Sequence, residues 1–77
     1  MSVMTTRRSV RRARQLFPTR ADLLYEAEGQ RIQARLARDQ ATAARRHGER
    51  HRAQALSALA RRFDEGARFY TVLARTS

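Results

Sequence analysis

The feature that most restricts the fold is an apolar stripe in the last third of the sequence. Its residues recur at intervals of three and four, which is the spacing of a helix face packed in a bundle or coiled coil. They are Leu56, Leu59, Ala60, Phe63, Ala67, Tyr70, Leu73 and Ala74. The stripe predicts a long amphipathic helix over about residues 49–75. Gly66 lies at its edge, where close packing against another helix would explain a residue that weakens helices.

A second long helix is predicted over about residues 20–47. Thr19 is placed to cap its first turn, and Asp22 brings a carboxylate to the positive end of the helix dipole. The apolar stripe here has a period of roughly 3.5 residues and consists of Tyr25, Ile32, Leu36 and Ala43. We expect this stripe to be the packing seam of the helix. It is thin after Leu36, and close approach of a neighbour is allowed by Gly29, Ala34, Ala37, Ala41 and Ala44.

The two helices are separated by a polar segment that contains Gly48. Glycine after a helix favours a C-cap or turn. Two arrangements are possible, a helical hairpin folded at Gly48 or one long bent helix. The hairpin is favoured because the two stripes do not share one register, and isolated alanine-rich helices are only marginally stable in water.

A basic arm precedes the hairpin. Residues 1–21 carry six arginines and no acid, whereas residues 22–77 carry eleven arginines and all seven acids. Within the arm, Val10, Ala13, Leu16 and Phe17 predict a short amphipathic helix from Ser9 to Leu16, which Pro18 should end. We therefore expect an all-α chain with an arm over residues 1–18 and a helical hairpin over residues 19–77.

The small size of the chain limits its core. A chain of 77 residues forms one domain at most and buries only about 60% of its unfolded surface. It contains no cysteine, so disulfides and thiolate metal sites cannot add stability. We therefore expect the protein to associate with a partner or with itself. No apolar run approaches the length of a transmembrane helix.

The charge of the chain indicates an anionic partner. The net charge is +10, and all 17 basic residues are arginine, whose planar guanidinium binds phosphate in a bidentate manner. Arg31, Arg38 and Arg45 repeat every seven residues, and a second ladder consists of Arg61, Arg68 and Arg75. The predicted anion contacts, which should neutralise phosphates, are Arg7, Arg8, Arg11, Arg12, Arg14, Arg31, Arg35, Arg38 and Arg45.

Catalytic and metal-binding signals are weak by comparison. The acids form no convincing pair in an apolar pocket, and a short helical chain has little room for a cleft. His47 and His51 are four residues apart and could share a helix face, but no third ligand follows. We expect no enzyme activity, no metal and no cofactor.

Three functions remain open. The first is an accessory subunit of a larger protein or nucleoprotein assembly that binds nucleic-acid backbone through arginine. In this reading the residues that pack on protein are Tyr25, Ile32, Leu36, Leu56, Leu59, Phe63, Tyr70 and Leu73. No helix-turn-helix, zinc finger or RNA-binding signature is present, so binding should follow backbone and shape.

The second is an accessory subunit of a mitochondrial membrane complex, in which the arginines meet acidic subunits or anionic lipid and Phe69 and Leu73 dock. The acid-free start has the composition of a mitochondrial targeting segment. The third is a phage- or plasmid-type DNA-binding dimer that self-associates through Leu56, Phe63 and Tyr70. The compartment is left open between mitochondrion and cytoplasm, with no secretion signal.

Overall fold

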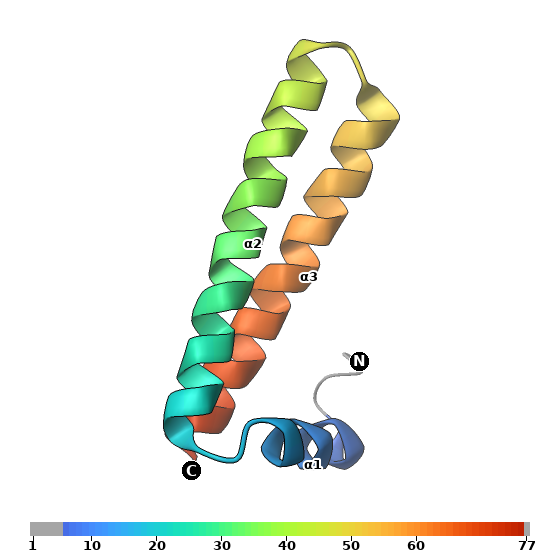
Figure 1. Cartoon of the computed structure of the whole chain (residues 1–77). Coiled ribbons are helices and arrows are strands. Elements are labelled where there is room, and N and C mark those ends of the chain that lie inside the picture. The colour runs from blue at the N-terminus through green and yellow to red at the C-terminus, as the bar shows by residue number, and fades with distance from the viewer. Residues whose placement is uncertain (1–5, 77) are drawn as a thin grey trace.

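The computed structural model describes residues 6–76 and contains three α-helices. They are α1 (Arg7–Leu16), α2 (Arg20–Arg46) and α3 (Arg50–Arg75). The long helices α2 and α3 run side by side in opposite directions, and α1 lies across the end where α2 begins and α3 stops (Figure 1). The predicted all-α class, the hairpin and the short preceding helix are confirmed, and the alternative of one long bent helix is wrong.

Local sequence signals account for where the first two helices begin. The Thr6 side chain accepts a hydrogen bond from the Ser9 amide at the start of α1. Thr19 and Asp22 form a reciprocal capping box at the start of α2, in which each side chain bonds the backbone amide of the other residue. These bonds satisfy amides that have no partner inside a helix. Between the two helices, Phe17 leaves helical geometry directly before Pro18, as expected for a residue that precedes proline.

The turn at Gly48 reverses the chain. Gly48 has a φ of 73°, a left-handed conformation that glycine adopts without steric cost. The Glu49 amide donates to the Ala44 carbonyl at 2.9 Å and the Gly48 amide to the Arg45 carbonyl at 3.0 Å. This is the Schellman pattern, which satisfies the last carbonyls of α2. It therefore stops α2 and directs α3 back along it.

The interface between α2 and α3 is built from small side chains. The buried alanines of α2 follow a heptad pattern, and those of α3 recur every seven residues. They are Ala27, Ala34, Ala37, Ala41 and Ala44 on α2, and Ala53, Ala60, Ala67 and Ala74 on α3. Small side chains let two helix backbones approach closely and pack without voids. The hairpin is therefore held by many small contacts and few large ones.

This interface corrects the seam predicted for α2. Tyr25 is 83% exposed, Ile32 52% and Leu36 49%, so the helix does not use these residues to pack against α3. The prediction was wrong because it gave weight to large side chains, whereas the alanines occupy the opposite face of the same helix. The role suggested for Ala34, Ala37, Ala41 and Ala44, which is to allow close approach of a neighbouring helix, is confirmed. Gly29 does not share this role, because nothing lies within 4 Å of the position where its Cβ would be.

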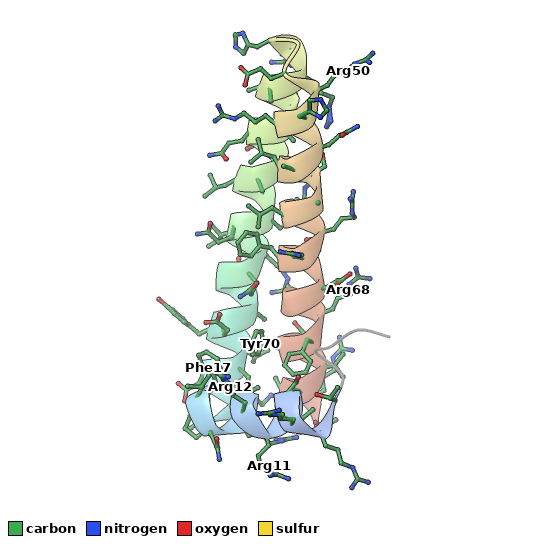
Figure 2. The ribbon with its side chains drawn as sticks, turned by 90° about the vertical axis from the view of Figure 1, so that its right-hand side faces the viewer. Arg11, Arg12, Phe17, Arg50, Arg68 and Tyr70 are labelled. Atoms are coloured by element: carbon green, nitrogen blue, oxygen red, sulfur yellow. The ribbon has the colours of Figure 1, made fainter. Side chains whose placement is uncertain are left out.

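Large side chains gather at the end of the hairpin that α1 covers. The core there combines Ala13, Leu23, Leu73 and Ala74 with the partly buried Val10, Phe17, Phe69 and Tyr70. The Phe17 and Tyr70 rings (Figure 2) meet edge to face with centroids 5.4 Å apart. Phe69 meets Tyr70 similarly at 5.1 Å. Such pairs favour a fixed relative orientation. The stripe on α1 thus anchors the helix to the hairpin.

The predicted seam of α3 is only partly buried. Leu73 lies in the core, at 6% exposed, while Leu59 is 40% exposed. Leu56, Phe63 and Tyr70 are intermediate. Leu73 is therefore not available for docking a partner, and the docking role suggested for it is wrong. Phe69 is partly buried against the chain's own core, and its docking role stays a prediction.

Candidate nucleic-acid interface

The two arginine ladders of the hairpin meet on one face. A groove between α2 and α3 contains two open hollows of about 310 and 320 Å³. The first is lined by Arg31, Arg35, Arg38, Asp64, Ala67 and Arg68. The second, nearer the turn, is lined by Arg45, Arg50, Ala53, Gln54, Ser57 and Arg61. We call this surface the arginine groove.

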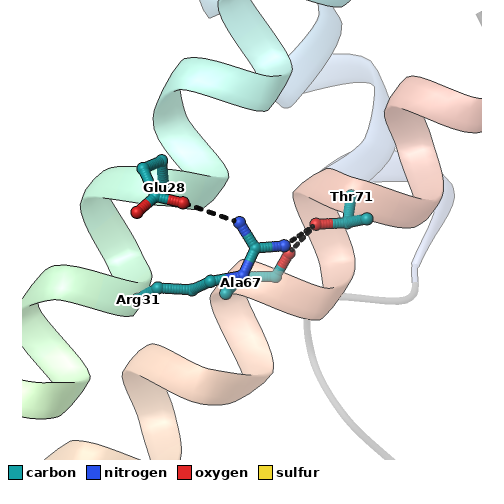
Figure 3. Close-up of polar contacts among 4 residues, drawn as sticks. All are labelled: Glu28, Arg31, Ala67 and Thr71. Carbon is teal, nitrogen blue, oxygen red and sulfur yellow. Dashed lines mark hydrogen bonds and ion pairs between the residues drawn. The ribbon is translucent and has the colours of Figure 1, made fainter.

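Two polar contacts across the hairpin hold the groove in register. Arg38 Nη1 lies 2.7 Å from Asp64 Oδ2. Arg31 Nη2 donates to Thr71 Oγ1 at 2.8 Å, and this hydroxyl donates in turn to the Ala67 carbonyl at 2.7 Å (Figure 3). Because both arginines extend from α2 to α3, they fix how the two helices are aligned along their length. Each contact is exposed and contributes little to stability alone.

Positive charge predominates in the groove. Of the residues that line its two hollows, Asp64 is the only acid, and it is paired with Arg38. Glu28, at the outer edge, pairs with Arg31 at 3.2 Å. Within residues 6–76, Arg35, Arg45, Arg61 and Arg68 form no ion pair. These residues are exposed, and their guanidinium groups can bind an external anion without first breaking an ion pair.

The arginines of α1 form a separate basic region. This helix packs against Phe69, Tyr70 and Leu73, whereas the groove lies on the side of α3 that carries Asp64 and Thr71. All five arm arginines are exposed, and Arg11 extends from the side of α1 away from the hairpin (Figure 2). The nine predicted anion contacts are therefore divided, four in the groove and five on α1.

Sequence reasoning missed part of the groove. Arg50 was not among the expected contacts, and Arg61 and Arg68 were recognised as a ladder without being assigned to the same face as Arg38. Arg75, the last residue of that ladder, does not line either hollow. Pairing Arg38 with Asp64 is the signal that could have identified the groove from the sequence. One ion pair between antiparallel helices sets their register, and the register determines which arginines of α2 and α3 lie side by side.

Other polar groups do not gather into a reactive site. His47 and His51 are both exposed near the turn. No cluster of three or more histidine or acidic side chains that could hold a metal occurs in residues 6–76. Burial, and further the negative charge of Glu26, raises the pKa of Tyr70. That ring belongs to the core beneath α1.

Comparison with known proteins gives no family assignment. No protein family, curated protein or solved structure matches the chain. In the described part of the chain, no helix is both long and apolar enough to span a bilayer.

Proposed function

We propose that this protein is a non-catalytic nucleic-acid-binding subunit that holds a phosphate backbone in the arginine groove. The observation that carries the proposal is the convergence of arginines from both long helices on one groove whose single acid is already paired. Arginine binds phosphate oxygens through two parallel hydrogen bonds. Each phosphate neutralised also releases condensed counterions, which favours binding at low salt.

The spacing of the ladder suits a repeating anion. Arg31, Arg38 and Arg45 are successive members of a seven-residue repeat, so they lie about 10 Å apart along the helix axis. Phosphates of one duplex strand rise about 3.4 Å along the axis, so one step of the ladder corresponds to roughly three nucleotides. An extended polyanion can therefore contact several arginines at once, which a small anion cannot do.

Backbone contacts rather than base contacts are expected. The residues that line the groove include no aromatic side chain. Phe69 and Tyr70 are engaged in the core under α1. Stacking on bases is thus not offered by this face, and we expect binding that depends on charge and shape with little sequence preference.

The test compares two variants of equal charge. Replacing Arg45, Arg61 and Arg68 by glutamine removes three groove arginines that form no ion pair. The control replaces Arg20, Arg46 and Arg62, which are exposed but do not line the groove. Binding to an RNA and a DNA duplex is measured by fluorescence anisotropy across a range of salt concentrations, with helicity checked by circular dichroism.

The groove variant should lose affinity, and the slope of log K against log salt should become shallower by about three, one for each lost phosphate contact. The control should change that slope by less than about one, because only long-range attraction is reduced. Equal losses in the two variants would show that net charge alone attracts nucleic acid. Weak, salt-insensitive binding by the unmodified chain would favour an accessory subunit that docks on protein or membrane.

A further inference from the structure

The outer face of α2 carries an apolar ridge that the hairpin leaves uncovered. We use the name outer ridge for Tyr25, Gly29, Ile32 and Leu36, which lie on the side of α2 opposite the buried alanines. Tyr25 is 83% exposed and Ile32 52%. Gly29 is also unexplained by the fold, since a Cβ there would meet nothing within 4 Å, yet glycine costs a helix about 1 kcal/mol relative to alanine.

Charge on this face differs from the rest of the molecule. Around the ridge, α2 presents Asp22, Glu28 and Asp39 against Arg35 and Arg46, and Glu28 also pairs with Arg31, so acids and arginines balance here in a chain whose net charge is +10. An anionic partner is therefore not favoured here. Two copies of such a basic chain repel one another, and this balanced face contributes less to that repulsion than the arginine groove.

The ridge is also complementary to itself. If a second α2 lies antiparallel with its Ile32 opposite Ile32, each residue meets residues of the other copy that lie on the same flank and about equally far from Ile32 in the opposite direction along the helix. Leu36, four residues after Ile32, then comes close to the open position at Gly29, three residues before it, and Ala21 faces Ala43. Glu28 lies beside Arg35 of the other copy, and the Tyr25 hydroxyl comes near the Asp39 carboxylate. Large thus meets small at Leu36 and Gly29, and acid meets base at Glu28 and Arg35, so the patch is complementary to its own copy, as an interface with two-fold symmetry requires.

We propose that the protein forms a symmetric dimer through the outer ridge, with the two α2 helices antiparallel and centred on Ile32. Each ridge then covers the apolar surface of the other, and Leu36 of one copy packs on the backbone at Gly29 of the other. The dimer is a bundle of four long helices with α3 on its two outer sides.

This arrangement has a consequence for the arginine groove. The two-fold axis of an antiparallel helix pair passes between the helices, perpendicular to the plane that contains them. Rotation about this axis leaves each flank of α2 on the same side of that plane in both copies. Arg31, Arg38 and Arg45 occupy one flank of α2. Both grooves therefore open on one side of the dimer, and both α1 helices lie on the other. The proposal does not depend on nucleic-acid binding, because dimerisation is measured without it.

The first experiment is sedimentation equilibrium of the purified chain over a wide concentration range. We expect the mass to rise from that of one chain to that of two and no further. Ile32→Asp should raise the dimer dissociation constant at least about a hundredfold, because each dimer loses two buried isoleucines. Val72→Asp is the matched control, since Val72 is a β-branched residue of α3 with similar exposure, 55%. It should leave the dimer intact.

The register is tested by exchanging charges. Glu28→Arg and Arg35→Glu should each weaken the dimer about tenfold, because each places like charges at two symmetric sites. Mixing the two variants should restore a heterodimer, in which every such site again joins opposite charges. Circular dichroism confirms that both remain helical, as expected for exposed side chains.

Three results would overturn the proposal. The first is a chain that stays monomeric at all concentrations, which would assign the ridge to a different partner. The second is a dimer that Ile32→Asp leaves unchanged, which would place the interface elsewhere, for example at the half-exposed Leu59. The third is a failure of the mixed charge variants to associate, which would exclude the antiparallel register.

Discussion

At the scale of single residues, the glycines are in different environments. Gly48 has a φ of 73° and Gly29 faces open space, while a Cβ at Gly66 would lie 2.7 Å from Gln30 Oε1. Only Gly48 needs the left-handed conformation that side chains resist. The three residues look alike in the sequence, and the surrounding structure decides what each contributes.

Two alanine substitutions should therefore have opposite effects. Gly48→Ala should lower the free energy of unfolding by about 1 kcal/mol, because alanine is strained at positive φ. Gly29→Ala should raise it by about 0.5–1 kcal/mol, because alanine favours helix and meets no obstacle. Urea unfolding followed by circular dichroism at low protein concentration measures both. A stabilising Gly48→Ala would mean that the turn differs from the one described.

Tyr70 makes stability depend on pH in the alkaline range. Burial, and secondarily the charge of Glu26, raises the pKa of Tyr70 above its ordinary value of 10.0. The unfolded chain thus loses this proton first as the pH rises through 10, so the folded state loses stability from there up to the pKa of the folded protein.

Tyr70→Phe should remove part of this alkaline loss, which is measured as the difference in unfolding free energy between neutral pH and a pH above 10. Tyr25→Phe is the control, since its side chain is 83% exposed, and it should retain the full loss. If the two variants behaved alike, another group would be responsible for the alkaline loss.

At the scale of elements, α2 and α3 are joined through alanine instead of large apolar side chains. Of the described residues, Leu23 and Leu73 are the only large buried ones, and both belong to the end covered by α1. The middle of the hairpin depends on close approach of the helices, so it has little tolerance for added volume.

Ala60→Leu should accordingly destabilise the chain by about 1–3 kcal/mol, enough to threaten a domain of this size. Ala60 is 3% exposed. Ala58→Leu adds the same atoms to an exposed position of the same helix and should be nearly neutral. Thermal unfolding of both variants compares them directly. Equal stability would contradict the packing of Ala60 against α2.

At the scale of the whole molecule, the chain separates charge from apolar surface. Arginines of both long helices line the groove on one face, α1 covers aromatic residues on another, and the outer ridge of α2 remains exposed. The groove variant, which replaces Arg45, Arg61 and Arg68, and the ridge variant Ile32→Asp change residues on different surfaces. They therefore test anion binding and self-association independently.

The sequence by itself determined the helices and their ends. Thr19 with Asp22, Pro18 and Gly48 act through neighbouring backbone groups, so their effect is readable without knowing the fold. It also determined the basic character of the surface, because 17 arginines face only seven acids. The division into an arm and a hairpin domain, and the absence of catalysis, stay predictions.

Only the tertiary structure decided which face of α2 is buried and which arginines share a groove. Two faces of α2 were possible, because the Tyr25, Ile32 and Leu36 stripe and the alanine row both have helical spacing. In the hairpin it is the alanine row that is buried against α3. The free energy gained by burying an alanine depends on how closely the neighbouring helix approaches, and the sequence of one helix does not show that distance. The groove likewise depends on the register between α2 and α3, which Arg31 and Arg38 fix through residues far along the chain.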